Sequence, residues 1–340
     1  IRNWQSEHPD FTVHPVRIEQ IPDKHAGPGY ARKLGMDEAV RRFALLNQHN
    51  GIILSLDADT TCAKNYFTAI ENALTNQPGL NAGTLFFEHP TDGHEFDQPI
   101  YHAVVQYELF LRYYKQGLLF CGFPYAFHTI GSAFFVKALA YAKQGGMNKR
   151  KAGEDFYFLN KIFSLGYAKE LVETSVYPSP RPSDRVLFGT GPEVKKIAAN
   201  QENQIMTYHP DVFSALKTLF IQVDRLYELS SDAYQAVLTH LPASLQNFMN
   251  KNNAYENIRR IRKNCASPEI FRKHFFQWFD GLKIIRYIHE AHEKSLQKIG
   301  INDAAKMMLK KSGYAGMEEK EATELLGIYK EIERTRPVHI

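Results

Sequence analysis

The sequence predicts an α/β fold, with a mostly parallel sheet flanked by helices, followed by an all-helical C-terminal region. Over residues 1–185, short apolar segments alternate with helical segments, which is typical of layered α/β domains. Residues 201–340 show the apolar spacing of helices almost throughout. A stretch rich in Pro, Gly and Ser, "PSPRPSDRVLFGTGP" at 178–192, lies between the two patterns and reads as a linker or as an ordered loop over a site.

The elements follow from local patterns. The segment "IILSL" is apolar at four of its five positions, which suits a parallel strand covered on both faces. The segment that begins "GPGYARKLG" has Pro28 in its first turn and an apolar stripe, which indicates a helix. The expected strands are 11–19, 52–56, 80–88, 126–136 and 167–180. The expected helices before residue 200 are 27–50, 63–74, 98–119, 137–146 and 154–166.

Composition excludes several classes of protein. A chain of 340 residues with 44% hydrophobic and 23% charged residues fits an ordinary globular protein of two domains. The net charge of +4 is too small, without clustering, for a nucleic-acid binder. Three cysteines far apart in the sequence favour a reducing compartment. No apolar run could span a bilayer. We therefore expect a cytoplasmic protein, with peripheral contact of the basic stretch 259–263 at the inner face of the membrane as a variant.

Two aspartates follow the strand at 52–56 with no basic residue next to them in the sequence. Asp57 and Asp59 stand at the carboxyl end of that strand, where ligands gather in open α/β sheets. Two carboxylates at this spacing can turn toward one point, and hard oxygen ligands suit Mg²⁺ or Mn²⁺. The alternative is that Asp59 and Thr60 form a turn or cap the following helix. His128 and His209 are further metal-ligand possibilities, with a hydrogen-bonded structural histidine as the more common role.

Two more segments carry groups of the right chemistry. The helix that begins near Gly29 has Arg32 in its first turns, and such a helix start suits phosphate oxygens, although a solvated basic face is the simpler interpretation. Glu154 and Asp155 open a helix after a glycine-rich loop. A carboxylate there could act as general base toward a hydroxyl, and helix capping is the alternative role.

Together these segments resemble a known family. "GPGYARKLGMDEAV" followed by "GIILSLDADTTCAKNYF" is similar to the central part of the family 2 glycosyltransferases of GT-A (Rossmann-like) fold. "GSAFFVKALAYAKQGGMNKRKAGEDFYF" resembles the acceptor segment of the same family. The resemblance covers roughly residues 10–180. The strand and acidic turn with which the family begins have no counterpart here, so we expect residues 1–200 to form a catalytic domain whose N-terminal part is missing, followed by a helical domain at 201–340.

The resemblance implies a role for each matching residue. Asp59 would contact the metal directly, and Asp57 would serve the metal and the sugar or ribose. Arg32 and Gly29 match the segment beside the nucleotide, although Lys33 stands where the family has Asn. Asp155 would be the catalytic base, and Glu154 would help to orient the acceptor. Arg185 would lie in a loop over the diphosphate.

The sequence thus predicts a metal-dependent, inverting glycosyltransferase that uses Mn²⁺ or Mg²⁺ and a nucleotide-diphosphate sugar. The acceptor would be a hydroxyl of a glycan, a lipid-linked compound or a small molecule. Three alternatives stay open at this point: a sugar nucleotidyltransferase, a retaining GT-A transferase, and a non-catalytic binding or scaffold protein in which the acidic pairs are caps.

Overall fold

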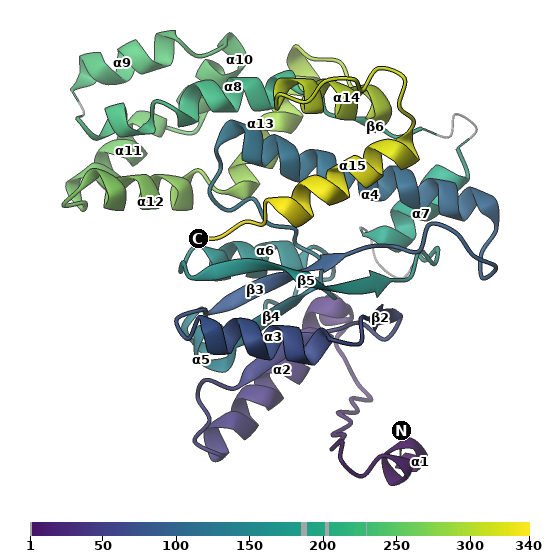
Figure 1. Cartoon of the computed structure of the whole chain (residues 1–340). Coiled ribbons are helices and arrows are strands. Elements are labelled where there is room, and N and C mark those ends of the chain that lie inside the picture. Colours follow the sequence, from purple (N-terminus) through teal and green to yellow (C-terminus); the bar gives the residue numbers. More distant parts are fainter. Residues whose placement is uncertain (1, 185–188, 201–203, 229) are drawn as a thin grey trace.

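The computed structural model describes residues 2–184, 189–200, 204–228 and 230–340. It shows an α/β layer below a helical layer, with the long helix α4 between them (Figure 1). The strands of the main sheet are β1 (Ile52–Ser55), β2 (Thr60–Cys62), β3 (Ala82–Phe87), β4 (Phe134–Lys137) and β5 (Ala168–Pro178). The helices of this part are α1 (Arg2–Glu7), α2 (Pro28–Leu45), α3 (Tyr66–Asn76), α4 (Gln98–Cys121), α5 (Ala138–Lys143), α6 (Glu154–Phe163) and α7 (Thr190–Ala198).

The sheet has the order β1-β4-β3-β5-β2. Strands β1, β3 and β5 run in one direction, but only the neighbours β3 and β5 form a parallel pair. The other three pairings are antiparallel. The expected mostly parallel sheet is therefore a mixed one. The reason is that β4 lies between β1 and β3 in the opposite direction, which local sequence patterns do not reveal.

The two faces of the sheet are covered by different helices. One hydrophobic cluster joins α2, α5 and α6 to residues such as Phe134 and Val136 of β4. Another joins α3 to Phe135 of the same strand and to Leu85 and Phe87 of β3. Successive side chains of a strand point to opposite faces, so adjacent residues of β4 serve the two clusters. This explains why these strands are apolar at nearly every position and why they read as doubly covered.

The predicted strand at residues 11–19 is not a strand. The structure leaves this segment outside the sheet, with Phe11 and Val16 both 55% exposed. An alternating apolar pattern makes a strand only when a neighbouring strand pairs with its N–H and C=O groups. The other four expected strands are present, although the one expected at 126–136 is confined to Phe134–Lys137.

The helical region packs on α4. Its elements are β6 (Met206–Thr207), α8 (Asp211–Phe220), α9 (Ser231–Thr239), α10 (Ala243–Lys251), α11 (Ala254–Lys263), α12 (Pro268–Trp278), α13 (Gly281–Lys294), β7 (Ile299–Gly300), α14 (Ile301–Lys311) and α15 (Ala322–Thr335), with a short 3₁₀ turn at Val223–Tyr227. A second 3₁₀ turn, at Asp23–His25, precedes α2. The two-residue strands β6 and β7 pair with each other, and the end of the chain pairs antiparallel with β5 through a bridge between Lys169 and His339. The rest of the region that the structure describes consists of helices and their connections. The largest hydrophobic cluster joins these helices to α4, and Gly117 allows close contact because a Cβ there would lie 2.5 Å from the Phe213 ring.

Buried charges join the helical layer to the sheet. Arg112 of α4 is fully buried and donates to Glu108 at 2.9 Å and to Glu333 of α15. Lys115 donates to Glu170 of β5 at 2.5 Å. Burial would raise the pKa of Glu333, but Arg112, His128 and Lys115 lower it well below its usual range, so this carboxylate stays ionised. Within the described part of the chain, no helix is long and apolar enough to cross a bilayer.

Candidate active site

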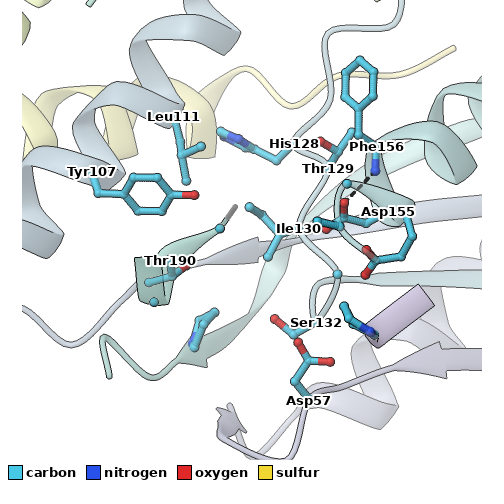
Figure 2. Close-up of a pocket in the computed structure, with 18 of the residues that line it drawn as sticks. Asp57, Tyr107, Leu111, His128, Thr129, Ile130, Ser132, Asp155, Phe156 and Thr190 are labelled. Atoms are coloured by element: carbon cyan, nitrogen blue, oxygen red, sulfur yellow. Dashed lines mark hydrogen bonds between the residues drawn. The ribbon is translucent and has the colours of Figure 1, made fainter. Parts of the chain in front are cut away.

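A cavity of about 980 Å³ lies at the end of the sheet, between α2, α4, α6 and the start of α7. Its polar lining includes charged residues from segments far apart in the sequence: Arg32, Asp57, Asp59, Lys115, Glu154, Asp155 and Arg181. Figure 2 shows Asp155 in the first turn of α6, with Tyr107 and Thr190 in other parts of the same lining. The two acidic pairs singled out in the sequence therefore meet at one cavity, as their predicted roles require.

Asp57 and Asp59 lie in the turn between β1 and β2. The Thr60 N–H donates to the backbone carbonyl of Asp57 at 3.0 Å, so the turn itself is held by main-chain atoms. The two side chains are therefore available to the cavity, and each is 45% exposed. The backbone here does form a turn, as the alternative interpretation expects, but Asp57 and Asp59 also line the cavity.

Arg32 supplies the positive charge that the local sequence lacks. Its Nη2 donates to both carboxylate oxygens of Asp57 at 2.7 and 2.8 Å, and its Nη1 donates to Glu154. Burial alone would lower the pKa of Arg32. The nearby charges of Asp57, Glu154 and Asp155 raise this pKa by more than burial lowers it, so the guanidinium stays charged. Arg32 thus links Asp57 at the strand end to Glu154 at the start of α6.

The acidic pair opens α6 after Gly153, whose φ of +68° lies in the left-handed region that favours glycine. Glu154 is buried, and burial raises its pKa despite the contact with Arg32. Asp155 is partly exposed to the cavity and accepts the Phe156 N–H at 2.7 Å. Burial, followed by the charge of Glu154, raises the pKa of Asp155 to about 6. A carboxylate with this pKa is ionised at neutral pH yet is a better proton acceptor than an ordinary aspartate.

Gly29 has a different setting from the one predicted. It is buried and does not line the cavity, and a Cβ at this position would lie 2.3 Å from the Arg150 carbonyl and 2.9 Å from Cβ of Glu154. The glycine is therefore required for the close approach of α2 to the loop before α6. This packing places Arg32 beside Glu154. The contact of Gly29 with a nucleotide stays a prediction.

The loop after β5 also reaches the cavity. Arg181 donates to Asp59 Oδ2 at 2.7 Å. The predicted residue Arg185 lies outside the described residues. The start of α7, at Thr190, also lines the cavity and contacts His89 Nε2 at 3.2 Å. The Pro, Gly and Ser content and the family resemblance both pointed to this loop, but the pairing of Arg181 with Asp59 had no local signal in the sequence.

A divalent cation fits the chemistry of Asp57 and Asp59, because both offer hard carboxylate oxygens on the same cavity. Asp57 is paired with Arg32 and Asp59 with Arg181, so a cation would compete with a guanidinium for each carboxylate. Among the described residues, the group that places three metal-type donors within 4.8 Å is a different one, formed by His128, Glu170 and Glu333. Lys115 contacts both of its glutamates, at 2.5 and 3.7 Å, and already supplies positive charge there.

The two histidines considered as ligands make hydrogen bonds within the protein. His128 contacts Glu333 at 2.9 Å, and burial lowers its pKa. His209 lies in the helical region, where its Nδ1 accepts the Asp211 N–H at 3.2 Å. His128 lines the cavity, but its contact with Glu333 makes it part of the buried charge cluster between α4 and α15.

The remaining wall of the cavity is aromatic and apolar. It includes the stripe Tyr107, Phe110, Leu111, Tyr114 and Leu118, whose i, i+3, i+4, i+7 and i+11 spacing places them on one face of α4. Tyr125, Phe127, Ile130 and Phe156 line it from the loop before β4 and from α6. In the sequence, α4 is apolar on most sides, so periodicity could not separate the side that packs in the core from the side that faces the cavity.

Comparison with known proteins leaves this site to be judged on its own geometry. No model of a known protein family matches the chain, and no curated protein matches it.

Proposed function

We propose that this protein is a metal-dependent, inverting glycosyltransferase that moves a sugar from a nucleotide-diphosphate donor to an acceptor hydroxyl. The supporting observation is that Asp57, Asp59, Glu154 and Asp155, from two segments about a hundred residues apart, line one cavity together with Arg32 and Arg181. Capping or turn formation alone would not require these four carboxylates to share a cavity. The grouping therefore favours an enzyme over a scaffold protein.

In the proposed reaction, Asp155 accepts the proton of the acceptor hydroxyl. The oxygen then forms a bond to the anomeric carbon, and the bond from that carbon to the diphosphate breaks with its electron pair on the diphosphate. A bound Mn²⁺ or Mg²⁺ would neutralise charge on the leaving group. Asp59 and Asp57 are the residues that would hold the cation, and Arg32 keeps Asp57 and Glu154 in place.

The acceptor would approach Asp155 along the aromatic wall of the cavity. Phe156 follows the base directly in α6, and Leu111 and Tyr107 face the same cavity from α4. Aromatic side chains can stack on the apolar face of a sugar ring or contact an apolar aglycone. This arrangement fits a glycan, a lipid-linked compound or a small glycoside as acceptor.

The test is a screen for transfer and donor hydrolysis across nucleotide sugars with Mn²⁺ or Mg²⁺, using the wild type and Asp155→Asn. We expect Asp155→Asn to abolish transfer and to leave donor binding nearly unchanged. Asp59→Ala should lose metal-dependent donor binding. Asp184→Asn is a matched control, since Asp184 lies in the same loop as Arg181 but is paired with Lys195 and does not line the cavity.

Three outcomes would decide against the proposal. Full transfer by Asp155→Asn would mean that the base is elsewhere. Absence of nucleotide-diphosphate binding with Mn²⁺ in the wild type would favour the scaffold alternative. Conversion of the nucleotide sugar and added pyrophosphate into a sugar 1-phosphate and a nucleoside triphosphate would favour a nucleotidyltransferase. The anomeric configuration of the product, read by NMR, separates inverting from retaining transfer.

A further inference from the structure

Arg181 contacts Oδ2 of Asp59, one of the two carboxylate oxygens that could bind a cation. We propose that Arg181 holds Asp59 in the protein without a bound cation, releases it when a divalent cation binds, and then binds the diphosphate of the donor. This inference rests on the proposed function and adds a diphosphate-binding residue that also tunes cation affinity. Its geometric basis is the contact of Arg181 Nη2 with Asp59 Oδ2 at 2.7 Å on the cavity wall.

Strand pairing brings the two residues together. In the β2–β5 ladder, Thr60 is opposite Pro178, and the Ser179 N–H donates to the Asp59 carbonyl at 3.0 Å. Pro180 and Pro182 flank Arg181, and each fixes its own φ near −65°. The backbone is thus restricted around Arg181, so the side chain rather than the loop is the part free to change partner.

Arg32 and Arg181 differ in how firmly they are held. The Arg32 side chain is 13% exposed, contacts two carboxylates and lies so close to Gly131 that a Cβ there would be 2.3 Å from its Nη2. The Arg181 side chain is 44% exposed, and its carboxylate partner among the described residues is Asp59. Breaking the Arg32 contacts would leave buried groups without partners, whereas breaking the Arg181 contact returns two exposed groups to water.

Charge explains why Arg181 would pair with Asp59 in the absence of a cation and with the diphosphate in its presence. An exposed ion pair is weak, so a divalent cation at Asp59 can displace the guanidinium. Cation and guanidinium then repel each other until an anion lies between them. A diphosphate supplies that anion, because arginine donates paired hydrogen bonds to phosphate oxygens. Arg181 should therefore oppose binding of the cation alone and favour binding of the cation together with a diphosphate.

The experiment is isothermal titration calorimetry with Mn²⁺ alone, and then with inorganic pyrophosphate at saturating Mn²⁺. Arg181→Gln should bind Mn²⁺ alone about two- to fivefold more tightly than the wild type, because the competing ion pair is gone. The same variant should bind pyrophosphate about tenfold more weakly, because a charged hydrogen-bond donor is lost. Circular dichroism confirms the fold, which this exposed substitution should not alter.

Lys195→Gln is the matched control. It removes one positive charge from the same region by breaking the exposed Lys195–Asp184 pair, away from the cavity lining. Both affinities should stay within about twofold of the wild type, since a distant exposed charge is screened. A change in Lys195→Gln equal to that in Arg181→Gln would overturn the inference, because the effect would then be one of net charge.

Asp59→Asn separates the inference from the proposed function. If the wild type binds Mn²⁺, Asp59→Asn loses it, and Arg181→Gln leaves both affinities unchanged, the cation site stands and the role of Arg181 is wrong. If neither the wild type nor any variant binds Mn²⁺, or if Asp59→Asn binds it as well as the wild type, the proposed cation site fails and the inference fails with it.

Discussion

Replacing Asp155 with Asn should stabilise the folded protein at neutral pH. Burial and the neighbouring Glu154 raise the pKa of Asp155 from 3.8 to about 6. The folded protein must therefore ionise a carboxyl group that ionises more readily in the unfolded chain. A difference of about 2 pKa units corresponds to about 3 kcal/mol at pH 7. Asp155 is partly exposed to the cavity, so we expect a gain of about 1–3 kcal/mol after solvent screening.

The pH dependence gives the sign of the effect. Between the two pKa values, the folded state binds more protons than the unfolded state, so the cost of ionising Asp155 increases as the pH rises from 3.8 to about 6. The stabilisation by Asn should be fully present at neutral pH and fall to about a third at about pH 4.5. Urea unfolding followed by circular dichroism at the two pH values measures it.

Asp92→Asn is the control, because Asp92 is an exposed residue in the loop after β3. Its effect should stay within about 0.5 kcal/mol at both pH values. The reasoning is refuted if Asp155→Asn is no more stable than the wild type at neutral pH, or if its gain does not shrink at acid pH. Stabilisation with loss of transfer is the pattern expected when a site maintains a charge that the fold disfavours.

Three further results are expected. Glu333→Gln should lower the free energy of unfolding by about 3–5 kcal/mol in urea titrations, because it leaves the buried charges of Arg112 and Lys115 short of a partner. Glu331→Gln, at an exposed position of the same helix, should have little effect. Gly83→Ala should destabilise the protein by about 1–3 kcal/mol, since a Cβ there would lie 2.5 Å from the Lys169 carbonyl oxygen and from the Phe135 ring. Gly79→Ala should be tolerated, because the nearest atom to a Cβ is 3.8 Å away, and thermal unfolding compares the two variants. If Asp155 is the base, kcat/KM should rise with pH through about 6 and then level off, and a rate that is flat between about pH 5 and 7 would assign the base to another group.

The secondary structure was largely predictable because it depends on local spacing. The stripe in residues 28–45 and the apolar run at 52–55 both formed the expected elements. The expected strand at 11–19 was wrong because a strand needs a partner edge, and no local pattern tells whether one is present. The antiparallel insertion of β4 depends on the path of the chain between distant segments, so the mixed sheet could not be read from the sequence.

The candidate site was predictable in its acidic half. Asp57, Asp59, Glu154 and Asp155 stand at element ends, where the termination of an apolar pattern by carboxylates is visible in the sequence. The aromatic wall was hidden because α4 is apolar on both its core side and its cavity side. The packing role of Gly29 was also hidden, since the atoms that exclude a Cβ belong to Arg150 and Glu154.

The amino-acid sequence by itself determined most of the helices, four strands of the main sheet and the carboxylates at the element ends, because these depend on neighbours within a few residues. Only the tertiary structure decided where the balancing charges come from. Arg32 is 25 residues from Asp57, and Arg181 is 122 residues from Asp59. Electrostatic pairing acts through a few ångströms of space, and the distance between two charges in space is set by the packing of the elements that carry them.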